Sequence, residues 1–279
     1  MYVTINGTRL NVKLLGSELV DRPVMIAHHG APGLGSMAEP DAAFARFAHE
    51  LPLLVFDARG SGRSDGEPPF SHAQWADDIE GLRVWSGAEK VVVAGGSYGG
   101  FIAMEYAINY PDRVQALILR DTTADNTHMD VALRNAMESS RVTIDRAKFD
   151  RIVSGTVKDD ADLADCWREI LPLYDHDYNP EAVEQRAKAT PYRYRTHNYA
   201  FSVLHKNYDI RDRLPQITCP TLVTVGRHDW ITPVECSEAI AALIPNSELV
   251  VFENSGHSPQ VEEYDRFSSV VHQFLRAHT

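Results

Sequence analysis

A serine flanked by glycines is the clearest sign of chemistry in this sequence. The segment Gly95-Gly96-Ser97-Tyr98-Gly99 follows the apolar run 91–94 and precedes a helical stretch at 101–110. A G-x-S-x-G pattern between a strand and a helix is typical of a nucleophilic serine on a tight, strained turn. Glycine is needed at 95 and 99 because a side chain there would collide with the neighbouring strand or helix. Ser97 is therefore the predicted nucleophile.

A serine hydroxyl becomes an effective nucleophile only when a base removes its proton. His257 lies in a loop after the last apolar run, 249–252, and is the predicted general base. Asp229 follows the preceding apolar run and is the predicted acid that orients the histidine. Asp121, at the end of an earlier run, is the alternative acid. Activity lost in Asp121→Asn but kept in Asp229→Asn would identify Asp121 as the orienting residue.

An oxyanion that develops during attack on a carbonyl needs two hydrogen-bond donors. The backbone N–H of Tyr98, directly after the nucleophile, is one candidate. The backbone N–H of Ala31, in the early loop 29–33, is the other. His28 and His29 sit side by side at a strand end, where they point to opposite faces and cannot readily share a ligand. Both are interpreted as structural, with His29 bracing the oxyanion loop.

These residues must be positioned by a sheet. Alternating segments at 2–5 and 9–15, joined by Asn6-Gly7, predict an antiparallel hairpin at one edge. Continuous apolar runs then alternate with helical segments, which predicts a parallel sheet covered on both faces. We therefore expect an α/β fold with a mostly parallel eight-stranded sheet. The six continuous runs are 24–27, 53–56, 91–94, 114–119, 222–225 and 249–252.

The alternation stops between residues 122 and 214, a region with helical patterns and many aromatic residues. It resumes near Cys219, which predicts a helical cap inserted into one core domain made of 1–121 and 215–279. Trp167 and Tyr174 in this cap, and Trp230 beside the acid, are candidate pocket residues. Four acidic residues of the cap could attract an amine, although most of them are interpreted as solvent-facing: Glu138, Glu169, Asp175 and Asp177.

The chain resembles the α/β-hydrolase superfamily in the order of its predicted triad, Ser97, Asp229 and His257, and in two further motifs. Within it, the chain resembles the proline iminopeptidase-like branch (peptidase family S33) and its esterase relatives. The segment His29-Gly30-Ala31-Pro32-Gly33 is similar to the H-G-G-P-G of that branch, with alanine in place of the second glycine. The segment 57–64, DARGSGRS, is similar to its D-x-R-G-x-G-x-S turn and is interpreted as structural.

The resemblance implies hydrolysis through an acyl-enzyme of a small carboxylic ester or lactone, or of an N-terminal, prolyl-type amide. No metal and no organic cofactor is implied. One alternative is hydrolysis of a carbon–carbon bond, as in hydrolases of ring-cleavage products with the same fold. A second is a ligand receptor in which the triad is vestigial.

The charge and composition of the chain limit the kinds of molecule that it is expected to bind. The chain has 27 basic and 39 acidic residues and a formal charge of −12, which disfavours nucleic acids and anionic membranes. Its N-terminus lacks a basic start and an apolar core, and no apolar run is long enough to span a bilayer. Three cysteines without metal-ligand spacing favour a reducing compartment. We expect a cytoplasmic protein whose partner is a small-molecule substrate.

Overall fold

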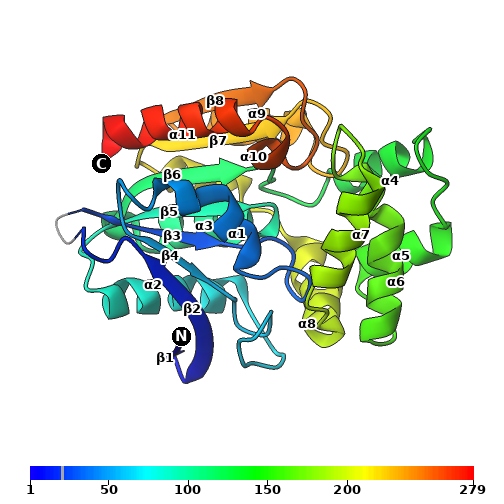
Figure 1. Cartoon of the computed structure of the whole chain (residues 1–279), viewed down its shortest axis with the longest axis horizontal. Helices are drawn as coiled ribbons and strands as arrows, with labels where there is room; N and C mark the ends of the chain where they lie inside the picture. Colours follow the sequence, from blue (N-terminus) through cyan, green and yellow to red (C-terminus); the bar gives the residue numbers. More distant parts are fainter. Residues whose placement is uncertain (20–21) are drawn as a thin grey trace.

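A single mixed sheet forms the centre of the molecule (Figure 1). The computed structural model describes residues 1–19 and 22–279. The strand order is β1-β2-β4-β3-β5-β6-β7-β8; β2 pairs antiparallel with β1 and β4, and the other neighbours are parallel. This confirms the predicted mostly parallel, eight-stranded sheet. The strands are β1 Tyr2–Ile5, β2 Thr8–Leu15, β3 Val24–His28, β4 Leu53–Phe56, β5 Val91–Gly96, β6 Val114–Arg120, β7 Thr221–Gly226 and β8 Ser247–Phe252.

The predicted hairpin is present at the edge of the sheet. Asn6 and Gly7 both have positive φ angles, 49° and 73°, as a two-residue type I′ turn requires. Ile5 pairs with Thr8 across this turn. The local sequence thus determines the register of the first two strands.

Helices cover both faces of the sheet. One apolar cluster packs α1 and α11 against it, and a second packs α2, α3 and α9 against the opposite face. No helix in the described ranges is both long and apolar enough to cross a bilayer. The helices are α1 Ala38–Phe44, α2 His72–Ser86, α3 Tyr98–Asn109, α4 Met129–Met137, α5 Arg146–Ser154, α6 Asp160–Ile170, α7 Pro180–Ala189, α8 Tyr194–Tyr199, α9 Val234–Leu243, α10 Pro259–Glu262 and α11 Tyr264–His278.

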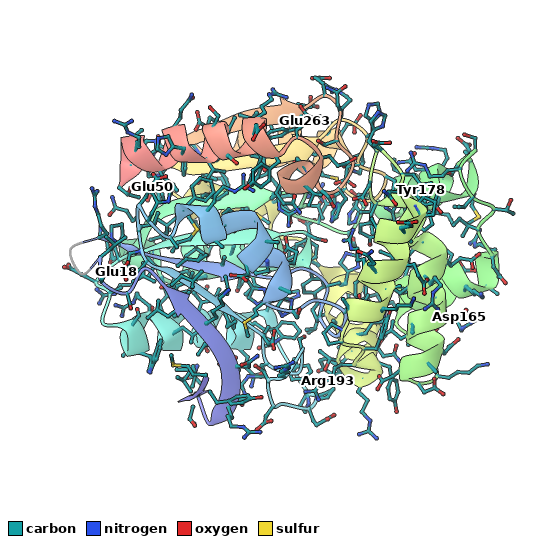
Figure 2. All side chains as sticks on the ribbon, viewed as in Figure 1. Glu18, Glu50, Asp165, Tyr178, Arg193 and Glu263 are labelled. Atoms are coloured by element: carbon teal, nitrogen blue, oxygen red, sulfur yellow. The ribbon has the colours of Figure 1, made fainter. Side chains whose placement is uncertain are left out.

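Helices α4 to α8 lie between β6 and β7 in the sequence and gather beyond the arrowheads of β6, β7 and β8 in Figure 1. Their apolar residues, among them Phe149 and Leu163, form a cluster that also takes in Leu34 and Trp230 from loops of the sheet region. Arg193, labelled in Figure 2, ties them to the loops of the sheet: its backbone N–H donates to the Gly33 carbonyl at 2.8 Å, and its guanidinium donates to the Ser64 carbonyl at 2.6 Å. These helices therefore cover the end of the sheet from which Ser97 projects.

Candidate active site

Ser97 occupies the sharp turn between β5 and α3. Its φ and ψ angles are 53° and −127°, a strained conformation for a residue with a side chain. A Cβ atom at Gly99 would lie 2.5 Å from the His29 carbonyl oxygen and 2.6 Å from that of His28. The turn therefore presses against the backbone of the early loop 29–33, and only glycine fits at that contact.

His257 and Asp229 form a buried, hydrogen-bonded pair. The Nδ1 atom of His257 lies 2.7 Å from Oδ2 of Asp229. The other oxygen, Oδ1, accepts from the backbone N–H groups of Ile231 (3.0 Å) and Thr232 (3.1 Å), and the Thr232 hydroxyl donates to Oδ2 at 2.7 Å. Because a carboxylate only accepts, the proton of the neutral imidazole is on Nδ1. This leaves Nε2 of His257 with a lone pair, as a general base requires.

The surroundings of His257 shift its pKa. Burial is the largest single effect and lowers the pKa, but the charge of Asp229, its hydrogen bond and the charge of Asp121 together favour the imidazolium more strongly. The net result is a pKa above the ordinary 6.5. The imidazole is thus a stronger base than a free histidine.

Asp121, the alternative acid, lies behind this pair and serves other groups. Its Oδ1 accepts from the backbone N–H of Gly226 at 2.9 Å, and its Oδ2 accepts from Arg120 at 3.3 Å. Burial, and then the charge of Asp229, raise its pKa to about 7 against the opposing effect of Arg120. Of the two acids, Asp229 is the one hydrogen-bonded to His257.

One atom each of Asp121, Asp229 and His257 lies within 4.8 Å of the others, a grouping that could hold a metal ion. The Asp229–His257 hydrogen bond and the Arg120 guanidinium already satisfy these groups. A cation would have to displace both, so the arrangement fits a hydrogen-bonded pair better than a metal centre.

The loop 29–33 runs beside the serine. A Cβ atom at Gly30 would lie 3.3 Å from Cβ of Ser97. No described group accepts a hydrogen bond from the backbone N–H of Ala31 or of Tyr98. His29 braces the loop, because its Nε2 accepts from the N–H of Ala58 at 3.0 Å and its Nδ1–H donates to the Gly30 carbonyl at 2.8 Å. The two predicted oxyanion donors are therefore free.

A cavity opens onto Ser97. The centres of water molecules could occupy a volume of about 60 Å³ inside it. One water needs roughly 10–15 Å³ by this measure, so the cavity suits a small ligand. Of the candidate pocket residues, Trp167 and Tyr174 line it, whereas Trp230 does not and packs against Tyr174 with ring centres 5.6 Å apart. The walls are Ala31, Leu34, Ser97, Tyr98, Phe101, His128, Met129, Ile152, Val153, Trp167, Ile170, Tyr174, His197, Phe201, His205, Ile231 and Thr232.

Three histidines of the cavity wall were missed by sequence reasoning: His128, His197 and His205. Burial lowers the pKa of His197 to about 4 and that of His205 to about 3, so both are neutral. His197, Phe201 and His205 recur every four residues, and consecutive rings of this series lie 4.5 and 5.6 Å apart. That spacing places side chains on one helical face and was the available signal.

Comparisons with known proteins show the family and the fold of this chain. A family model described as alpha/beta hydrolase fold matches residues 23–264. The proline iminopeptidase PfmaB of Pestalotiopsis fici is 35% identical over 269 residues, which cover 95% of each chain. A 2-hydroxymuconate semialdehyde hydrolase of Pseudomonas putida is 28% identical over 91% of this chain and 86% of its own. The solved structure of a thermophilic esterase from Thermogutta terrifontis superposes with a TM-score of 0.78 at 28% identity, covering 100% of this chain and 99% of that one.

The predicted resemblance to proline iminopeptidases and esterases is thus confirmed at the level of family and fold. A family match over residues 23–264 includes the strand, turn and helix around Ser97 and both later loops. The chain therefore belongs to the α/β-hydrolase fold family and is a hydrolase of that fold.

Proposed function

We propose that this hydrolase cleaves small, uncharged carboxylic esters or lactones with Ser97 as nucleophile, His257 as general base and Asp229 as orienting acid. The observation that carries the substrate class is the cavity beside Ser97: its described lining residues include no lysine, arginine, aspartate or glutamate. An unpaired charge taken from water into such surroundings is strongly disfavoured. The uncharged wall of this cavity therefore favours a neutral substrate.

The reaction begins when Nε2 of His257 takes the proton of the Ser97 hydroxyl as Oγ attacks the carbonyl carbon. Asp229 stabilises the resulting imidazolium through the 2.7 Å hydrogen bond to Nδ1. The backbone N–H groups of Ala31 and Tyr98 hold the negative oxygen of the tetrahedral intermediate. His257 then gives its proton to the leaving alcohol oxygen, which leaves an acyl group on Ser97.

The second half repeats these steps with water. His257 takes a proton from a water molecule, the hydroxide attacks the acyl carbon, and the Ser97–acyl bond breaks as the proton returns to Oγ. The products are a carboxylic acid and an alcohol, or one hydroxy acid from a lactone.

We further propose that residues 122–214 act as a cap domain over a core of 1–121 and 215–279. This proposal is supported by the cavity wall, since ten of its residues come from this segment and the others from loops and α3 of the sheet region. Substrate choice would then be set mainly by the cap.

The relatives favour a second candidate, release of an N-terminal prolyl-type residue, because one named proline iminopeptidase is 35% identical over nearly the whole chain. Such a substrate carries an ammonium group that needs an anionic partner. The acidic cap residues considered from the sequence do not line the cavity, and Glu169 and Asp175 are paired with Lys148 and Arg186. The cavity therefore supports ester or lactone hydrolysis better than it supports release of an N-terminal prolyl-type residue.

Carbon–carbon bond hydrolysis also requires a charged substrate, in this case an anion. A vinylogous keto acid brings a carboxylate, and the described cavity wall offers neither a lysine nor an arginine to receive it. The histidines of the wall stay neutral because burial lowers their pKa values.

The test compares kcat/KM for three substrates, with Ser97→Ala as the blank: p-nitrophenyl butyrate, p-nitrophenyl hemisuccinate and prolyl p-nitroanilide. The first two have similar chains and leaving groups but differ by one carboxylate. We expect butyrate to exceed hemisuccinate by at least about 100-fold and the prolyl amide to be turned over poorly. Efficient, Ser97-dependent turnover of either charged substrate would overturn the proposed substrate class.

A further inference from the structure

Two buried imidazoles in the cavity wall take no part in the proposed reaction. His128 directly precedes α4, and His205 follows the π-helical segment Ala200–Leu204. Their side chains are almost inaccessible, and their ring centres lie 5.7 Å apart in an edge-on arrangement. Both line the cavity that contains Ser97. They form a polar pair in an otherwise largely apolar wall.

The hydrogen bond that His128 makes fixes its protonation. Its Nδ1 lies 3.0 Å from the backbone carbonyl oxygen of Asp125, and a carbonyl can only accept, so Nδ1 carries the proton. Burial lowers the pKa of this histidine, which keeps the ring neutral. Its Nε2 is therefore an acceptor, and the Asp125 carbonyl is the one hydrogen-bond partner that this ring has in the described chain.

His205 has no hydrogen bond at either ring nitrogen within the described chain. Its ring stacks on Phe101 with centres 5.8 Å apart and planes inclined by 9°. Burial, followed by the nearby His128 and His72, lowers its pKa to about 3. A neutral imidazole offers one N–H donor and one acceptor, and both remain available here.

These ring nitrogens belong to residues that line the cavity and have no partner in the described chain, so they are available to hydrogen-bond a group that binds there. A hydroxyl is the matching group, because it can donate to Nε2 of His128 while accepting from an N–H of His205. An ammonium cannot accept, and a carboxylate cannot donate. We propose that His128 and His205 form a specificity subsite that binds a hydroxyl of the ester or lactone substrate. This proposal rests on the proposed ester hydrolysis.

The kinetic test uses two matched substrate pairs that place the hydroxyl on either side of the ester. One pair is p-nitrophenyl 3-hydroxybutyrate and p-nitrophenyl butyrate; the other is 2-hydroxyethyl butyrate and propyl butyrate. For at least one pair we expect kcat/KM to favour the hydroxylated member by at least about 10-fold. A ratio near one in both pairs, with Ser97-dependent turnover intact, would overturn the subsite but not the hydrolase.

Two variants test whether these histidines cause the preference for the hydroxylated ester. His128→Phe keeps a ring of similar size and removes the acceptor, and His205→Phe removes the donor. Each should bring the favourable ratio close to one. Met129 lies in the same wall and has only a weakly accepting thioether; Met129→Leu is the matched control and should leave the ratio unchanged. A ratio that survives in both phenylalanine variants contradicts the proposal.

A binding measurement keeps the proposal testable if turnover is slow or a variant fails to fold. In ¹⁵N-histidine-labelled Ser97→Ala protein, methyl 3-hydroxybutyrate or 2-hydroxyethyl butyrate should shift the Nε2 resonance of His128, whereas methyl butyrate should not. Unchanged ring resonances at saturating concentrations of both hydroxylated esters would exclude the subsite, whatever the enzyme turns over.

Discussion

The Nδ1 atom of His257 lies 2.7 Å from Oδ2 of Asp229 although 28 positions separate the two residues. The register of the sheet produces this approach. Gly226, the last residue of β7, pairs with Phe252, the last residue of β8, so the following loops start side by side. The backbone N–H of His228 then donates to the Ser255 carbonyl at 2.9 Å and joins the two loops. Backbone hydrogen bonds at the carboxyl ends of β7 and β8 thus hold the two loops that carry this pair.

Replacing Asp229 by asparagine should reduce kcat on p-nitrophenyl butyrate by about 10³–10⁴-fold. The amide no longer stabilises an imidazolium or enforces a proton on Nδ1, and this is the effect of such a change in a serine triad. Because asparagine keeps an oxygen for the backbone N–H groups of Ile231 and Thr232, the melting temperature should change little. Near-normal kcat in this variant would remove Asp229 from the mechanism.

The pH profile of kcat/KM should have an acidic limb with its midpoint above 6.5. The proposed mechanism needs the unprotonated imidazole, and the pKa of His257 is raised because the charge and hydrogen bond of Asp229 and the charge of Asp121 together outweigh burial. Activity therefore rises with pH through this pKa. The profile is measured between pH 5 and 9 on p-nitrophenyl butyrate, corrected with Ser97→Ala. A midpoint well below 6.5 would contradict the assigned environment of His257.

Gly99→Ala should disturb both fold and activity. Its Cβ would lie 2.5 Å from the His29 carbonyl oxygen, and backbone cannot move aside as a side-chain end can. Overpacking of this kind costs about 1–3 kcal/mol, and for a chain of this size each kcal/mol lowers Tm by roughly 2–4 °C. Activity should fall further, because the oxyanion loop is displaced. Gly87→Ala, where the new Cβ meets nothing within 4 Å, should keep full activity and is the control for activity; its φ of 75° strains an alanine, so its Tm should fall as well.

The turn 57–64 should be a structural element without a catalytic role. Its Arg59 makes a buried, two-pronged ion pair with Asp78 at 2.7 and 2.9 Å. Arg59→Met leaves a buried carboxylate unpaired, which typically costs about 3–5 kcal/mol and should lower Tm by about 10 °C. The kcat of the folded fraction should not change.

The exposed pair Arg9–Asp65 is the matched control for this ion pair, since both side chains are more than half exposed. Arg9→Met should leave Tm almost unchanged, because solvent screens such pairs. Loss of kcat in folded Arg59→Met protein would instead point to a functional turn.

The sheet was predictable because its strands are marked by local sequence. Buried parallel strands need continuous apolar runs, and all eight predicted strands are present with ends shifted by no more than two residues. The turn at Asn6-Gly7 and the glycines around Ser97 are equally local signals, since each is required by backbone geometry at that position. Residues placed by the carboxyl ends of these strands, such as Asp229 and His257, could therefore be chosen together.

The cavity wall was less predictable because it depends on how helices pack. The sequence favoured Trp230 slightly over Trp167 and Tyr174 as a pocket residue, yet Trp230 packs behind Tyr174 and does not line the cavity. His128 and His205 lie 77 positions apart and meet only through the fold of the intervening helices. Helical periodicity shows which residues share a face but not what that face contacts.

Asp121 is a positioning residue whose charge should be visible in the pH profile. It holds the backbone N–H of Gly226, at the start of the loop that carries Asp229, and its negative charge raises the pKa of His257. Asp121→Asn keeps an oxygen for Gly226 but removes the charge. The acidic limb of kcat/KM should therefore move to lower pH, because the imidazolium loses a stabilising neighbour, while kcat on the plateau stays within about 10-fold of the wild type. Burial and the charge of Asp229 raise the pKa of Asp121 to about 7, so this carboxyl also changes charge within the measured range, and the limb should be broader in the wild type than in the variant. A purely structural Asp121 would change Tm alone, and an unshifted limb in the folded variant would show that its charge does not reach His257.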